Sequence, residues 1–416
     1  MINSKSPSRF WPFFSTLLIV FLTDSLLFST SDIVVLNIAK KVVPIVLAVV
    51  LFFLTYGKYK ISIPLFLISI SIIVSMILGI GAVSKGATYI VQISLLVFAY
   101  EYSKTVSFED FSNSFIIIMR IIAIVSLVAF FMRSILVNLS FIPTIHTGGT
   151  LYYKTLFFTN LPINNSYGRR NFGPFWEPGA FQLYLNIALL FTVMRGKRFW
   201  AFDTALFVAT AVTTFSGAAL VPMPFVLLAA FLKNEKLKSK LRVLLFCIVL
   251  CIGMVYLFRY GVLAPIVDKL QGTNNDSYSV RLGSLLGNLK ATLINPFFGV
   301  NPDRQYQLRG IETELLSGIY YEGNTNTFTG LFASFGVFVG AYYIYRSYMF
   351  TKNFSNMTIV RILVFVSIFL ATSNEEFGQS IMFHTLLFIG GYPHLKKQQA
   401  IRETPNCDCA ISNEQL

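Results

Sequence analysis

Apolar runs of about twenty residues, separated by shorter polar stretches, recur along most of the chain. A helix needs about 20 apolar residues to cross the ~30 Å hydrocarbon core of a bilayer. The pattern therefore predicts an all-α polytopic membrane protein with about twelve spans, at 11–30, 36–56, 61–82, 86–102, 111–136, 178–195, 199–215, 217–232, 241–260, 326–346, 358–373 and 379–393.

Two connections, 138–177 and 261–325, are much longer than the others and mix aromatic, apolar and charged residues. Long connections that are not of low complexity usually carry function. They divide the chain into N-terminal spans (1–137), a first large loop (138–177), central spans (178–260), a second large loop (261–325), C-terminal spans (326–393) and a tail (394–416).

Within the second loop, residues 279–300 have the leucine spacing of an amphipathic helix, which Asn295-Pro296 ends. We expect this helix to lie at the membrane interface, with Arg281 near the lipid headgroups.

Lysines and arginines of the short connections fall on one side of the predicted membrane, as in "RGKR" (195–198) and "KNEKLKSKLR" (233–242). By the positive-inside rule that side is the cytoplasm, which also holds both termini. The two large loops then face outward. Lys40 and Lys41, near the outer end of the second span, are an exception to this rule.

The composition agrees with a membrane protein: 55% of residues are hydrophobic, 12% are charged and the mean hydropathy is +0.66. A net charge of +14 would suggest a nucleic-acid partner in a soluble protein. Here the topology of the cytoplasmic connections explains most of it.

The first large loop places Lys154, Arg169 and Arg170, together with His146, before any acidic residue. Outward-facing arginines oppose the positive-inside trend, so an anionic ligand is the obvious cause. The planar guanidinium donates two parallel hydrogen bonds to a phosphate and stays charged at any working pH. The alternative is pairing with loop carboxylates, and it stays open for Arg304 in the second loop.

Glu177 follows directly and precedes Pro178 at a predicted helix start. A carboxylate there is favoured by the helix dipole, and proline suits the first helical position. The same carboxylate, partly desolvated at the membrane edge, suits a general base.

Three further charged residues are candidates for a supporting role. Arg120 lies near the middle of the fifth span, where we expect it to face Asp24 or phosphate groups, in a structural or a functional pair. Glu375 and Glu376, between the last two spans, would orient loop arginines or hold a sugar hydroxyl.

Three motifs together resemble the bacterial O-antigen polymerase and O-antigen ligase superfamily. They are R-x-F-G-x-F-x-E-P-G (170–179), S-x-R-L-x-x-L with NPFFGV (279–300), and N-T-N-T-F with FGVFVGAYY (324–343). Ligases often carry a histidine where this chain has Asn324 or Asn326, which favours a polymerase.

The resemblance implies an enzyme of the bacterial cytoplasmic membrane that acts at the outer face. It would transfer a glycan from undecaprenyl diphosphate to a sugar hydroxyl of another lipid-linked repeat unit, making O-antigen, capsule or exopolysaccharide. It implies no cofactor and no metal, and the outer loops contain no Asp-x-Asp sequence. A chain-length regulator and a flippase of the same pathway are expected partners, and nucleic acid is not.

On this hypothesis, Glu177 is the first choice for the base and His146 the second. Lipid diphosphate needs its growing charge neutralised as it leaves, and the expected binders are Arg169, Arg170, Arg281 and Arg304. Tyr167, Phe172, Phe175 and Trp176 are candidates for stacking on sugar rings. Two alternatives stay open: an O-antigen ligase, and a flippase or other transporter, for which Arg120 and Asp24 would be the intramembrane charges.

Overall fold

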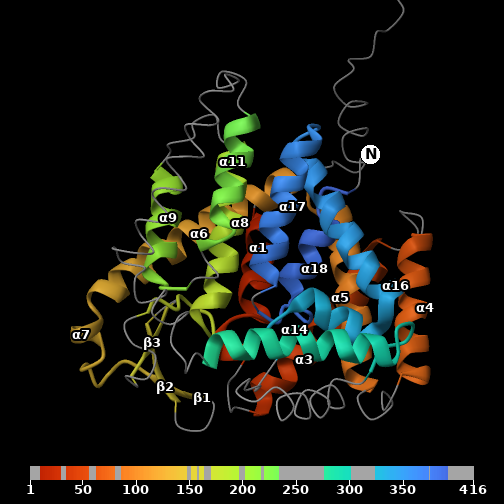
Figure 1. Cartoon of the computed structure of the whole chain (residues 1–416). Helices are drawn as coiled ribbons and strands as arrows, with labels where there is room; N and C mark the ends of the chain where they lie inside the picture. Colours follow the sequence, from red (N-terminus) through yellow and green to blue (C-terminus); the bar gives the residue numbers. More distant parts are fainter. Residues whose placement is uncertain are drawn as a thin grey trace, which may run out of the picture.

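The computed structural model describes residues 10–29, 34–55, 62–79, 86–147, 151–156, 159–163, 170–195, 202–216, 220–233, 276–300, 324–373 and 375–391. Most of these residues are helical, and the helices form a bundle (Figure 1). The N-terminal helices are α1 Phe10–Leu22, α2 Leu26–Ser29, α3 Val34–Thr55, α4 Ile63–Leu78, α5 Gly86–Thr105, α6 Phe108–Phe131 and α7 Arg133–Leu136. The later helices are α8 Pro178–Arg195, α9 Phe202–Thr213, α11 Met223–Lys233, α14 Asp276–Ile294, α16 Thr327–Phe350, α17 Thr358–Thr372 and α18 Ile381–Phe388.

Among the described residues, three helical segments are long and apolar enough to cross a membrane. They are Val34–Thr55, Phe108–Phe131 and Thr327–Asn353, the last of which continues from α16 into a 3-10 turn. Every predicted span contains a helix except 241–260, which lies outside the described residues. The structure therefore supports a helical membrane protein, whereas the number of crossings and their direction stay predictions.

The predicted span 11–30 is interrupted, because α1 ends at Leu22 and α2 begins at Leu26. At this break Ser25 forms an isolated β-bridge with Phe175, and the Leu26 amide donates to the Pro174 carbonyl at 2.9 Å. The interruption therefore ties the N-terminal helices to the residues that precede α8.

The first large loop contains a three-stranded antiparallel sheet, so the all-α expectation is wrong for this segment. Its strands are β1 Thr144–Thr147, β2 Leu151–Leu156 and β3 Thr159–Pro162, in the order β1-β2-β3. Threonine, isoleucine and tyrosine fit a pleated, half-buried surface, which explains why these short segments pair. Tyr153 of β2 is buried and packs its ring on that of Phe172, with 5.5 Å between ring centroids.

Aromatic side chains of α6 pack around Phe191, in the second half of α8. The Phe191 ring lies 5.7 Å from Phe108, 6.1 Å from Phe111 and 5.5 Å from Phe115 of α6, in edge-to-face geometry. Such pairs contribute about 0.5–1.5 kcal/mol each beyond their buried area. The helix that starts just after Glu177 is therefore held firmly in the bundle.

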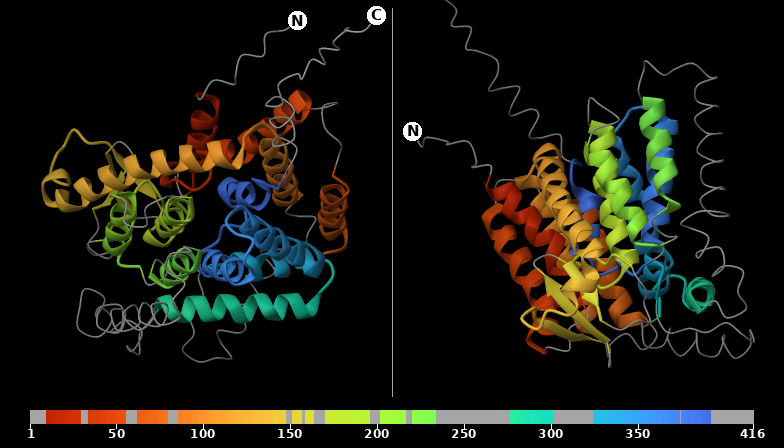
Figure 2. Two further views of the ribbon diagram at one scale, coloured as in Figure 1. Left: turned by 90° about the horizontal axis from the view of Figure 1, so that it is seen from above. Right: turned by 90° about the vertical axis from the view of Figure 1, so that its left-hand side faces the viewer.

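Helix α14 lies across one end of the bundle, the end that also carries the sheet (Figures 1 and 2). The predicted helix in the second loop is thus confirmed. Its polar face, with Ser284 and Asn288, is buried against the protein, whereas Leu289 is 48% and Leu293 81% exposed. An outward leucine face fits the predicted position at a membrane surface.

The NPFFGV segment that follows α14 packs on a kink in α16. Gly299 and Gly336 both have positive φ, of 74° and 82°. A Cβ on Gly336 would lie 2.0 Å from the Phe297 carbonyl oxygen, and one on Gly299 would lie 2.4 Å from the Ser334 backbone. Only glycine permits this close approach of the two backbones, which fixes where α14 meets α16.

Candidate functional site

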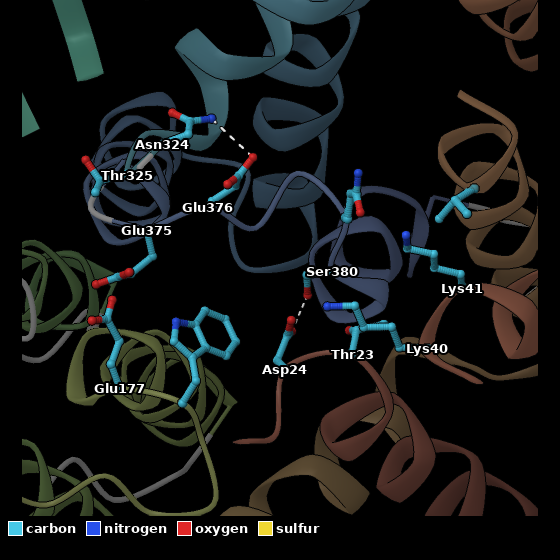
Figure 3. Close-up of a pocket in the computed structure, with 13 residues that line it drawn as sticks. Thr23, Asp24, Lys40, Lys41, Glu177, Asn324, Thr325, Glu375, Glu376 and Ser380 are labelled. Carbon is cyan, nitrogen blue, oxygen red and sulfur yellow. Dashed lines mark hydrogen bonds between the residues drawn. The ribbon is translucent and has the colours of Figure 1, made fainter. Parts of the chain in front are cut away.

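A cavity of about 430 Å³ lies where α3, α8 and the segments flanking α16 and α18 meet. Figure 3 shows the polar side chains that surround it. Trp176 and several neutral polar residues line it, together with four carboxyl groups and two ammonium groups. The charged residues are Asp24, Glu177, Glu375, Glu376, Lys40 and Lys41. Titratable groups with perturbed pKa values in a concave site make that site a candidate binding or catalytic centre.

Glu177 and Glu375 point toward each other across one side of the cavity (Figure 3). The Glu177 carbonyl accepts the Phe181 amide at 3.2 Å, so Glu177 caps α8 and Pro178 begins it, as the sequence predicted. Gly179 admits the partner carboxyl, because a Cβ at this position would lie 1.8 Å from Glu375 Oε1. The glycine in Glu-Pro-Gly is therefore needed for space beside the helix start.

The surroundings of this pair shift the pKa of Glu375. Burial raises the pKa of Glu375 well above its ordinary value, and the negative charge of Glu177, with a hydrogen bond between the two side chains, raises it further. The positive charges of Arg281 and Arg170 oppose this rise in pKa. These surroundings favour the protonated form of Glu375, whose hydroxyl can donate a hydrogen bond to Glu177.

Arg170, Glu177, Arg281 and Glu375 consequently form one electrostatic group, drawn from three distant parts of the chain. Arg170 precedes α8, Arg281 belongs to α14, and Glu375 follows α17. Nε of Arg170 also donates to the Thr214 carbonyl at 3.1 Å. Two of the four expected diphosphate binders therefore lie close enough to Glu375 for their charges to act on it, although neither lines the cavity.

The segment that carries Glu375 and Glu376 is fixed by the start of α16. The Thr327 hydroxyl donates to the Glu375 carbonyl at 2.7 Å and accepts the Phe377 amide at 2.8 Å. Nδ2 of Asn324 donates to the Glu376 carboxylate at 3.3 Å. These contacts hold both acidic side chains at the cavity.

Asn324 also connects the cavity to α14. Its Oδ1 accepts hydrogen bonds from Ser284 Oγ at 3.1 Å and from Asn288 Nδ2 at 3.0 Å. The sequence marked Asn324 only as a departure from the ligases. In the structure it holds together the elements that position Arg281 and Glu376.

Arg120 and Asp24 do not pair, so that expectation is wrong. Arg120 makes a two-pronged ion pair with Asp203 of α9, at 2.6 and 2.7 Å, and its side chain is 41% exposed. Asp24 is buried beside the cavity, where its carboxylate accepts hydrogen bonds from Tyr184 and Ser380. Because Arg120 faces outward, a carboxylate one helix away satisfies it.

The remaining expected residues are distributed as follows. Arg169 and Arg304 lie outside the described residues, as does Tyr167. His146 is exposed on β1, with its ring 4.9 Å from that of Tyr152, and it is not among the residues that line the cavity. The structure therefore separates the second choice of base from the first.

The aromatic candidates divide between the core and the cavity. Phe172 is 1% and Phe175 0% exposed, and the Phe175 ring stacks on Tyr184 at 4.2 Å. Both are core residues and unavailable to a sugar. Trp176 is half-buried and lines the cavity, where an indole ring suits a sugar face.

No protein-family model matches the chain, and no curated protein or solved structure does either. Within the described ranges, no group of three or more His, Cys, Asp or Glu side chains is arranged to hold a metal ion. The arrangement of side chains around the cavity is therefore the basis for the functional proposal.

Proposed function

We propose that this protein is a membrane glycosyltransferase that polymerises lipid-linked glycan units, with its active site at the cavity beside Glu177. The observation that supports this most strongly is the convergence of Arg170, Arg281, Glu177 and Glu375. Two guanidinium groups beside a carboxyl pair suit a reaction in which a hydroxyl loses a proton while a diphosphate leaves.

In the proposed reaction the acceptor sugar hydroxyl attacks the anomeric carbon of the donor glycan. The hydroxyl proton passes to Glu177, the new glycosidic bond forms, and the bond from the anomeric carbon to the diphosphate oxygen breaks. The bonding electrons leave on the diphosphate, so attack from the opposite side inverts the anomeric centre. Glu375, whose pKa is raised by its burial, orients Glu177 by the hydrogen bond between their side chains.

Arg170 and Arg281 supply positive charge for the leaving diphosphate. Their guanidinium groups stay charged at all working pH values and match phosphate geometry. Preorganised charges directed at the leaving group typically contribute about 100- to 1,000-fold in rate for each donor. The cavity thus offers a base for one substrate, and the two arginines near Glu375 offer an anion site for the other.

The proposed location is the outer face of a bacterial cytoplasmic membrane, as the positive-inside rule predicts. The helices that are long and apolar enough to cross a bilayer support membrane attachment. A transporter would be favoured by an intramembrane Arg120–Asp24 pair, and Arg120 pairs with Asp203 instead. An O-antigen ligase would share the donor chemistry and differ in its acceptor.

The test uses purified protein in lipid nanodiscs with an undecaprenyl-diphosphate-linked repeat unit as both donor and acceptor. Products are separated by length on a gel. We expect Glu177→Gln and Arg281→Ala to lower the rate of chain extension by about 100-fold or more. His146→Ala, on the exposed strand, is the matched control and keeps the normal rate.

Two results would contradict the assignment. If Glu177→Gln extended chains normally while His146→Ala did not, the base would lie on the sheet instead of at α8. If the wild-type protein released free undecaprenyl diphosphate only when given an acceptor other than a lipid-linked glycan, the reaction would be that of a ligase.

A further inference from the structure

An apolar groove of about 420 Å³ runs between α3 and α5, beside the cavity. It is lined mainly by aliphatic side chains, among them Ile38, Val42, Ile45 and Ile90. Val42 is 45% and Ile90 51% exposed, so the groove is open along its length. Both helices contribute to it at the end that holds the charged cavity.

The groove and the cavity share two residues, Lys41 and Val91, which line both. Lys41 therefore lies where the apolar groove meets the charged cavity. Figure 3 shows Lys40 and Lys41 together on the side of the cavity away from Glu177 and Glu375. The cavity thus has an ammonium pair at one side and a carboxyl pair at the other.

Topology does not account for these lysines. They lie in α3, one of the helices apolar enough to cross a membrane, and at the end opposite to that favoured by the positive-inside rule. Charged residues in such helices are costly and usually mark a path for a substrate. Lys40 lies near enough to Asp24 for their charges to attract, whereas Lys41 is exposed at the mouth of the groove.

We propose that this groove binds the isoprenoid chain of the lipid-linked acceptor, with Lys41 and Lys40 on its phosphate groups and its glycan in the cavity. The aliphatic walls match a hydrocarbon chain, and the ammonium groups at their end match an anionic head. The inference rests on the proposed function for naming this ligand an acceptor. It gives the polymerase two phosphate sites, the arginine pair for the donor and the lysine pair for the acceptor.

The experiment measures how much radiolabelled undecaprenyl diphosphate binds to the intact protein in phosphatidylcholine nanodiscs. We expect two equivalents for each wild-type chain. Lys41→Ala weakens one of them by about 10- to 100-fold, because it loses a charge-assisted hydrogen bond, and Lys41→Arg retains it. Arg281→Ala weakens the other equivalent.

The groove itself is tested with a matched pair on α3. Val42→Trp fills the groove and abolishes the Lys41-dependent equivalent. Val49→Trp, at a side chain that is 49% exposed against 45% for Val42, lies outside the groove and leaves binding unchanged. Lys352→Ala, an exposed lysine elsewhere, is the charge control.

Several outcomes would overturn the proposal: a single equivalent lost equally in Lys41→Ala and Arg281→Ala, or no effect of Val42→Trp. Displacement by phosphatidylglycerol at equal concentration would show an ordinary lipid site, and displacement by inorganic pyrophosphate would show a site for a soluble anion. If two equivalents bound but the chain-extension assay gave no product, the proposed function would be refuted and the lipid site would stand. If chain extension depended on Glu177 but not on Lys41 or Val42, the lipid site would be refuted and the proposed function would stand.

Discussion

A substitution at Gly179 tests the Glu177–Glu375 pair, because the Glu375 carboxyl occupies the space beside this glycine. An alanine Cβ there would lie 1.8 Å from Glu375 Oε1 and 2.8 Å from its carboxyl carbon. Ordinary contacts begin near 3.4 Å, so the carboxyl must move by roughly 1.6 Å, the difference between 3.4 and 1.8 Å. A shift of about 1 Å in a catalytic group can cost about 100-fold in rate. We therefore expect Gly179→Ala to slow chain extension by about that factor.

The effect of Gly179→Ala on stability has two parts of opposite sign. Displacing the buried Glu375 carboxyl from its hydrogen bond costs about 1–3 kcal/mol. Alanine in place of glycine favours the helix by up to about 1 kcal/mol. The single variant should lose up to about 3 kcal/mol, whereas in a Glu375→Ala background the same change should stabilise the protein. Denaturant unfolding of the four proteins in detergent measures this coupling.

Gly86, the first residue of α5, provides the control. A Cβ there would come no nearer than 3.7 Å to Met76 Sδ, an ordinary contact. Gly86→Ala should therefore leave both stability and chain extension near the wild-type values. If Gly179→Ala behaved in the same way, or if its cost persisted after Glu375 was removed, Glu375 would not occupy the space beside α8.

Three other predictions follow from single contacts. Because burial raises the pKa of Glu375, the folded state binds a proton that the unfolded chain loses near pH 4.5. The stability of the folded state should therefore fall as the pH rises from about 4.5 toward the raised pKa. Thermal unfolding of Glu375→Gln should depend less on pH than that of the wild type. Asp203→Asn should cost less than about 1 kcal/mol in unfolding experiments and leave chain extension unchanged, because its partner Arg120 is 41% exposed. Gly336→Ala should reduce the yield of folded protein on size-exclusion chromatography, because its Cβ would meet the Phe297 carbonyl at 2.0 Å.

The helices were largely predictable, because hydrophobic runs of membrane length leave few alternatives to a helix. The start of α8 was predictable too, since Glu177 and Pro178 carry a local capping signal that needs no distant partner. The leucine spacing of 279–300 correctly gave a helix. It could not show which face of α14 meets the protein, because Ser284 and Asn288 find their partner only at Asn324.

The rest of the site depends on contacts that no local pattern encodes. Glu375 lies 198 positions after Glu177, and nothing near either residue indicates that they share a hydrogen bond. The sheet was missed because its strands are only four to six residues long and have no sustained alternation. Lys40 and Lys41 did leave a signal in the sequence, because they are the exception to the positive-inside rule that the basic residues of the short connections follow.

Four carboxyl groups around one cavity would repel each other unless their charges were managed, and the structure shows how three of them are held. Asp24 accepts hydrogen bonds from Tyr184 and Ser380, Glu376 accepts one from Asn324, and burial raises the pKa of Glu375, which favours its neutral form. The remaining carboxyl, Glu177, shares a hydrogen bond with Glu375, on which the charges of Arg170 and Arg281 also act. Burial and the neighbouring Glu177 raise the pKa of Glu375, so a proton on Glu375 lets the two carboxyls share a hydrogen bond instead of repelling each other.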